Sequence, residues 1–99
     1  MKKNRIKIAR ITELQKQFGF WELQALINTG EVWHMEREMG IKAVQAMRMG
    51  ACMLPKERSL DALGNIVPSR LELRPYSMGT LQRCQEFWEK YYVADLQLN

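Results

Sequence analysis

The residue types that could carry out chemistry are few in this chain. His34 is the only histidine, and with Glu36 it forms a His-x-Glu pair, which is half of the signature of zinc-dependent deaminases. The other half, a Pro-Cys-x-x-Cys run, is missing, because Cys52 and Cys84 lie far apart in the sequence. We therefore expect no metal site, and two reduced thiols rather than a disulfide.

Other kinds of catalysis find equally little support. A nucleophile such as Cys52 needs a base beside it, and no sequence motif joins this cysteine to His34. Glu36 and Glu38 point to different sides of a helix, so they make a poor acid–base pair. The glycines are too scattered to form a phosphate-binding loop. The sequence thus predicts a protein that is not an enzyme and that uses no cofactor.

Length and composition are those of one ordinary globular domain. The chain has 99 residues, of which 46% are hydrophobic and 26% charged. No apolar run approaches the ~20 residues that cross a bilayer. The basic start of the chain is not followed by the apolar stretch of a signal peptide. We therefore expect a cytoplasmic protein that does not bind a membrane.

Positive charge is concentrated at the N-terminus. The whole chain has a formal charge of +4, whereas the first ten residues contain five basic residues and no acidic one. Such an arm either contacts nucleic-acid phosphates or is an ordinary solvated terminus. We divide the chain into a basic arm, residues 1–10, and a single helical domain, residues 11–99. The cations of the arm are Lys2, Lys3, Arg5, Lys7 and Arg10.

Three stretches have the apolar spacing of a helix face. They predict helices over about 12–29, 31–49 and 80–95, and hence a mainly α, compact three-helix domain. Very few residues join the first two helices, so these should pack as an antiparallel pair. Residues 55–79 lie between the second and third helices and form either an irregular segment or a short β-hairpin.

Local signals mark the ends of these helices. Thr12 and Gln15 have the spacing of a capping box at the start of the first helix. Gly19 weakens that helix, so it is kinked or begins late. Thr80, directly after Gly79, is the expected N-cap of the third helix.

One face of the predicted second helix is rich in methionine. Val32, Met35, Met39, Ala43 and Met47 recur at three- and four-residue steps. Methionine fills irregular cores and also lines adaptable binding surfaces. We interpret these residues as core, and exposure of some of them would indicate an interaction surface.

Residues 55–79 also contain the best candidates for binding. All three prolines fall in this segment, and the turn dipeptide Gly64-Asn65 has apolar residues on both sides. A long loop in so small a domain tends to be functional. Arginine and aromatic side chains in and around it fit contacts with phosphates, bases or a partner protein, although ordinary solvation is the alternative. The candidate binding residues are Trp33, Arg58, Arg70, Arg74 and Tyr76.

The Val67-Pro68-Ser69-Arg70 run presents an arginine on a stiff stem. The residue before a proline is held extended, and Ser69 can then bond a nearby backbone group. Arg70 would face a carboxylate or phosphate of a partner, or would pair with Glu36 or Glu38 and anchor the loop. We favour the second arrangement, because a long irregular segment needs an anchor.

Residues 30–81 resemble a group of small uncharacterised phage and prophage proteins. The pattern runs through Trp33-His34-Met35-Glu36, Gly40, Gly50, Leu54-Pro55, Gly64-Asn65-Ile66-Val67-Pro68-Ser69-Arg70 and Gly79-Thr80. The resemblance implies a mobile-element protein made inside a bacterium, and it transfers no residue roles. It suggests an accessory protein that binds, and thereby inhibits, a host or defence protein. A nucleic-acid-binding accessory protein is the alternative, and a homodimer is open.

Overall fold

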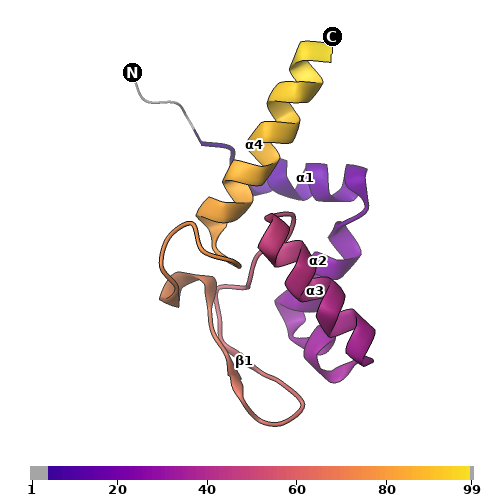
Figure 1. Ribbon diagram of the computed structural model, residues 1–99, viewed down its shortest axis with the longest axis vertical. Coiled ribbons are helices and arrows are strands. Elements are labelled where there is room, and N and C mark those ends of the chain that lie inside the picture. The colour runs from indigo at the N-terminus through magenta and orange to yellow at the C-terminus, as the bar shows by residue number, and fades with distance from the viewer. Residues whose placement is uncertain (1–4, 99) are drawn as a thin grey trace.

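The structure, a computed structural model, describes residues 5–98, with side chains described for residues 5–91. It is mainly helical with one small antiparallel hairpin, which confirms the predicted fold class (Figure 1). None of the helices in this part of the chain is long and apolar enough to cross a bilayer. In chain order the elements are α1 (Ile8–Phe18), α2 (Trp21–Thr29), the 3-10 helix η1 (Glu31–His34), α3 (Arg37–Met49), β1 (Ser59–Leu60), β2 (Ile66–Val67), the 3-10 helix η2 (Arg70–Glu72) and α4 (Leu81–Leu98).

The first predicted helix is two helices in the structure. Gly19 has a φ of 83°, a left-handed conformation that glycine adopts without strain, and it ends α1. The Phe20 N–H then donates to the Gln15 carbonyl at 2.7 Å, which closes the end of α1 before α2 turns away. The weakness expected at Gly19 is therefore a complete break.

The predicted capping box is wrong. Because α1 begins at Ile8, Thr12 and Gln15 lie inside the helix rather than at its start. The Gln15 side chain is 1% exposed and bonds buried groups instead of the helix end. The pattern misled because the same residue types serve capping and buried hydrogen bonding.

The second predicted helix is also shorter than expected. Residues 31–34 form η1, and the chain is extended at Met35 and Glu36 before α3 begins. Ala43 and Met47, which lie on α3, are buried as predicted. Met35 is exposed, because it lies before α3 and not on its buried face. In Figure 1, α2 and α3 lie against each other and run in opposite directions, which confirms the predicted antiparallel packing for these parts of the two predicted helices.

The third predicted helix is confirmed as α4, and its N-cap is confirmed at Thr80. The Thr80 Oγ1 accepts a hydrogen bond from the Arg83 N–H at 3.2 Å. Trp88, fully buried on α4, donates from its indole to the Ala51 carbonyl at 3.0 Å. Its ring packs against several other aromatic side chains: Phe18, Phe20, Phe87 and Tyr91.

An irregular segment, Ala51–Leu54, runs through the middle of the core. Its four side chains are all buried, although the segment belongs to no helix or strand. Apolar side chains of the helices and of η1 surround it: Ile11, Leu14, Ile27, Val32, Ala43, Met47 and Trp88. Its backbone polar groups therefore need partners inside the protein.

The N–H groups of Ala51 and Cys52 donate to the Ala46 carbonyl, and that of Leu54 donates to the Gly79 carbonyl. Two buried glutamines provide further partners. Gln24 receives the Met53 N–H at 2.9 Å and donates to the Met53 carbonyl at 2.8 Å. Gln15 donates to the Ala51 carbonyl at 2.9 Å and to the Gln24 side-chain oxygen at 2.8 Å. The two side-chain amides thus make hydrogen bonds to the backbone of this segment that a neighbouring strand would make in a sheet. We call Gln15 and Gln24 the buried glutamines.

The N-terminal residues that the structure describes lie against α4. Arg5 forms an ion pair with Glu89 at 3.2 Å, and the Ile6 N–H donates to the same carboxylate at 2.9 Å. The Gln85 amide donates to the Ile6 carbonyl at 3.0 Å. Residues 5–10 of the predicted arm are thus held by the helical body, and α1 starts among them. Lys2 and Lys3 lie outside the described residues.

Candidate interaction surface

The segment between α3 and α4 contains the short β-hairpin that the sequence suggested. Ser59 pairs with Val67 and Leu60 with Ile66 in an antiparallel ladder. Figure 1 shows this hairpin projecting away from the helices. We call residues 59–67 the hairpin.

The tip of the hairpin is closed by one carboxylate. The Asp61 Oδ1 accepts the Leu63 N–H at 2.9 Å and the Asn65 N–H at 2.8 Å. These bonds, the one from Asn65 foremost, hold the pKa of the Asp61 carboxyl below its usual value. Gly64 has a φ of 82°, which suits the turn. The tip is therefore ordered by its own residues.

An ion pair joins the base of the hairpin to η2. The Arg58 Nε lies 2.6 Å from the Glu72 Oε1, and this contact lowers the pKa of Glu72 and raises that of Arg58. The same oxygen accepts the Ser69 N–H at 3.3 Å, while the Ser69 hydroxyl accepts the Leu71 N–H at 3.0 Å. The backbone bond predicted for Ser69 is confirmed.

His34 ties the hairpin to the helical body. Its Nε2 lies 2.9 Å from the Leu60 carbonyl oxygen. Because a carbonyl only accepts, Nε2 carries the proton in this bond. The single histidine of the chain thus has a positional role in the structure.

Apolar side chains on and beside the hairpin point into solvent. Leu63 is 87% exposed, Ile66 59% and Leu60 54%, and Leu71 on η2 is 73% exposed. Isolated exposed leucines are ordinary, but several on one projecting element are a feature of binding surfaces. These residues are not among the binding residues predicted from the sequence. The available signal was a turn dipeptide with apolar residues on both sides and no sheet long enough to bury them.

The five predicted binding residues lie in different settings. Trp33 lines a shallow groove along α3, and its buried indole nitrogen has no hydrogen-bond partner among the residues that the structure describes. Arg58 is at the base of the hairpin, and Arg74 is exposed in the loop before α4. Tyr76 lies in the same loop under the Arg5 guanidinium, 5.8 Å from its ring centre. Arg70 faces a separate hollow.

The predicted pairing of Arg70 with Glu36 or Glu38 is wrong. Within the described part of the chain Arg70 forms no ion pair. Its Nη1 donates instead to the Met53 sulfur at 2.8 Å, and its backbone N–H donates to the Pro55 carbonyl at 3.0 Å. The loop is anchored through backbone bonds, the Arg58–Glu72 pair and His34, so Arg70 is not needed for that purpose.

The described cations of the basic arm are partly neutralised. Arg5 pairs with Glu89, and Arg10 lies 3.5 Å from Glu13. Lys7 is exposed at the start of α1. Carboxylates therefore lie beside two of the arginines that the nucleic-acid alternative would use.

The two cysteines are buried and not joined by a disulfide. Burial raises the pKa of each thiol, Cys52 and Cys84, to about 12. A thiol with so high a pKa stays protonated at neutral pH and is a poor nucleophile. Among the residues that the structure describes, no three His, Cys, Asp or Glu side chains are grouped to hold a metal ion.

Comparisons with protein-family models, with curated proteins and with solved structures found no match for this chain. The resemblance to small phage proteins therefore stays a prediction.

Proposed function

We propose that this protein is a non-enzymatic binding protein that uses its hairpin to grip a partner protein. One observation carries the proposal, namely the exposure of Leu60, Leu63 and Ile66 on an element that projects from the body. Burying such a side chain in a partner contributes roughly 1.5–3 kcal/mol. Three of them on one short hairpin supply the apolar centre of a specific interface.

The way the hairpin is held also favours this role. Asp61 orders the tip, while Arg58 and Glu72 brace the base. A loop that is ordered before it binds loses less conformational entropy in the complex. The apolar side chains are thus presented on a prearranged frame rather than on a flexible tail.

The resemblance to phage and prophage proteins indicates what class of protein the partner belongs to. We propose an accessory protein of a mobile element that binds, and thereby inhibits, a protein of the bacterial host or of its defence systems. The basic arm supports the alternative of a nucleic-acid partner less well, since Arg5 and Arg10 have carboxylates beside them.

The experiment is affinity purification of the tagged chain from bacterial lysate, with and without nuclease, followed by mass spectrometry. The test variant replaces Leu60, Leu63 and Ile66 with serine. The control variant replaces three other exposed apolar residues with serine, namely Met35, which follows η1, and Ile41 and Met49 on α3. We expect a stoichiometric protein that survives nuclease, is lost with the hairpin variant and is kept by the control.

Other outcomes would reject the hairpin proposal. A partner that remains with the hairpin variant but is lost with the control would move the interface to α3. Capture that disappears with nuclease, or weakens steeply between about 50 and 200 mM salt, would favour the nucleic-acid alternative. A dimer of the isolated chain that the hairpin substitutions dissociate, with no captured protein, would identify a second copy as the partner.

A further inference from the structure

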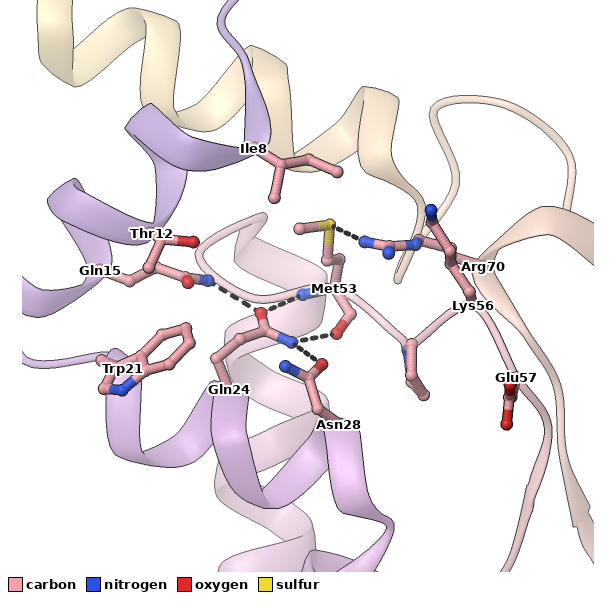
Figure 2. A pocket seen from close by; sticks show the side chains of 11 residues that line it. Ile8, Thr12, Gln15, Trp21, Gln24, Asn28, Met53, Lys56, Glu57 and Arg70 are labelled. Atoms are coloured by element: carbon pink, nitrogen blue, oxygen red, sulfur yellow. Dashed lines mark hydrogen bonds between the residues drawn. The ribbon is translucent and has the colours of Figure 1, made fainter.

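A hollow of about 460 Å³ lies between α1, α2 and the segment that follows Leu54. Its size is that of small-molecule sites. Figure 2 shows Arg70 and Lys56 at one end and Trp21 at the other, with the side chains of Gln24 and Asn28 between them. None of the exposed apolar side chains of the hairpin lines it.

No carboxylate of the described residues pairs with the Arg70 guanidinium in this hollow. A guanidinium has five N–H donors, and the hydrogen bond that Arg70's side chain makes within the described residues goes to the Met53 sulfur, a weak acceptor. Glu57 also lines the hollow, but in Figure 2 its carboxylate points away from Arg70. Burial lowers the pKa of Arg70, although such a group stays charged at neutral pH. Partial burial of a charge that has no partner is costly, so an anion in the hollow would be stabilised.

The position of Arg70 is fixed by its backbone. The Arg70 N–H donates to the Pro55 carbonyl at 3.0 Å, and the preceding Ser69 is held by Leu71 and Glu72. The guanidinium therefore starts from a rigid stem, as the sequence suggested. Rigid placement reduces the entropy lost when a planar oxyanion binds in the forked geometry.

The remaining walls suit a flat, weakly polar group. Trp21 offers an aromatic surface, and Ile8 covers the hollow from α1 (Figure 2). Thr12 adds a hydroxyl, while the amides of Gln24 and Asn28 are already bonded to each other at 2.9 Å. Such a wall favours an aromatic ring over a second charge.

We propose that this hollow binds a small molecule that combines an oxyanion with a flat apolar ring. The oxyanion, a carboxylate or a phosphate, pairs with Arg70 and is supported by Lys56, and the ring packs toward Trp21 and Ile8. The hollow does not include the hairpin, so binding of a small molecule can be tested separately from binding of the proposed protein partner.

The test is a nitrogen-15 NMR titration of the full chain with benzoate, phenyl phosphate and the neutral benzamide. We expect saturable shifts of the Arg70 Nε–H and Trp21 indole N–H resonances with at least one of the two anions. Benzamide should bind at least ten-fold more weakly than that anion. The anion that binds more tightly identifies the carboxylate or the phosphate as the natural group.

Three variants complete the test. Arg70→Met keeps most of the side-chain volume without the charge, and it should weaken anion binding at least ten-fold while leaving the Tm no lower. Arg74→Met removes an exposed arginine nearby and should bind as the unchanged chain does. Arg70→Lys keeps the charge without the fork and should retain part of the affinity. Equal binding by Arg70→Met, or equal binding of benzamide, would overturn the proposal, as would the absence of saturable shifts with both anions.

Discussion

Two stretches of the same connection between α3 and α4 are held in opposite ways. Ala51–Leu54 is buried and makes no ladder of its own, so the buried glutamines of α1 and α2 bond the Ala51 carbonyl and the Met53 N–H and carbonyl. The hairpin is exposed, and most of its hydrogen bonds are made by strand pairing and by Asp61, with one from His34. The first stretch therefore depends on side chains of distant helices, while the tip of the second depends on its own residues.

Because of this difference, we expect Ala51–Leu54 to determine the stability of the helical body and the hairpin to determine binding. Changes at Ala51–Leu54 or at its partners should unfold the body, because buried polar groups without partners are costly. Changes to the exposed side chains of the hairpin should leave the body intact, because Leu60, Leu63 and Ile66 are each more than half exposed.

Substitution of Gln24 by Ala should have the largest effect. It removes the partners of the Met53 N–H and carbonyl groups and also an acceptor for Gln15. We expect a loss of about 3–5 kcal/mol in the free energy of unfolding, a large part of the roughly 5–15 kcal/mol of a domain this size. Urea denaturation followed by circular dichroism measures it. The control is Gln17→Ala, an exposed glutamine of α1, for which a loss above about 0.5 kcal/mol would contradict the explanation.

Two glycines with left-handed backbones give the next contrast. A Cβ at Gly50 would lie 2.7 Å from the Phe87 Cβ and 2.9 Å from the Arg83 carbonyl, whereas a Cβ at Gly64 would meet no atom within 4 Å. Gly50→Ala should therefore cost about 2–4 kcal/mol, and Gly64→Ala about 1 kcal/mol from backbone strain alone. Thermal unfolding of both variants measures this, and equal losses would show that strain rather than packing dominates.

The body should lose stability at alkaline pH. The pKa of Cys52 and of Cys84 is raised from 9.0 to about 12 in the folded chain. The free energy of unfolding is therefore unaffected by ionisation of the thiols below pH 9. It falls above that pH, because the unfolded chain loses thiol protons that the folded chain keeps. Each thiol contributes a slope of up to about 1.4 kcal/mol per pH unit above that point.

Urea denaturation at pH 8, 9 and 10 tests this slope. The matched variant replaces both cysteines with alanine, and it should be less stable at pH 8 but lose less stability between pH 9 and 10. A parallel loss in the two proteins would assign the alkaline effect to other groups.

The hairpin should respond to acid instead. The pKa values of Asp61 and Glu72 are lowered by the bonds from Asn65 and Arg58 respectively, from ordinary values of 3.8 and 4.5. Their contribution is present above those values and is lost as the pH falls through the lower folded values. The effect is small because both carboxylates are on the surface.

Amide hydrogen exchange between pH 3 and 6, corrected for intrinsic rates, measures this loosening residue by residue. The Asn65 amide should lose protection on acidification, whereas the Met53 amide, bonded to the neutral Gln24, should not. Asp61→Asn keeps the acceptor oxygen and should make Asn65 less sensitive to pH. Joint loss of protection at Asn65 and Met53 would mean that the two stretches are not independent.

The main helical segments and the turn could be predicted from the amino-acid sequence alone. Apolar spacing predicted the helical segments, Thr80 predicted the start of α4, and Gly64-Asn65 indicated a hairpin as one of two alternatives. Each of these signals acts within a few neighbouring residues. Gly19 was recognised as a weak point for the same reason.

Which polar residues are buried and which charges are paired depends on tertiary contacts. The sequence predicted a capping role for Gln15 and an ion pair of Arg70 with Glu36 or Glu38. Both predictions were wrong because sequence spacing does not show which distant backbone lies opposite a side chain. The bonds of Gln24 to Met53 and the lack of a carboxylate at Arg70 depend on how α1, α2 and Ala51–Leu54 meet in space. The exposure of Leu63 likewise depends on the tertiary arrangement, since an apolar residue is covered only where another element packs against it.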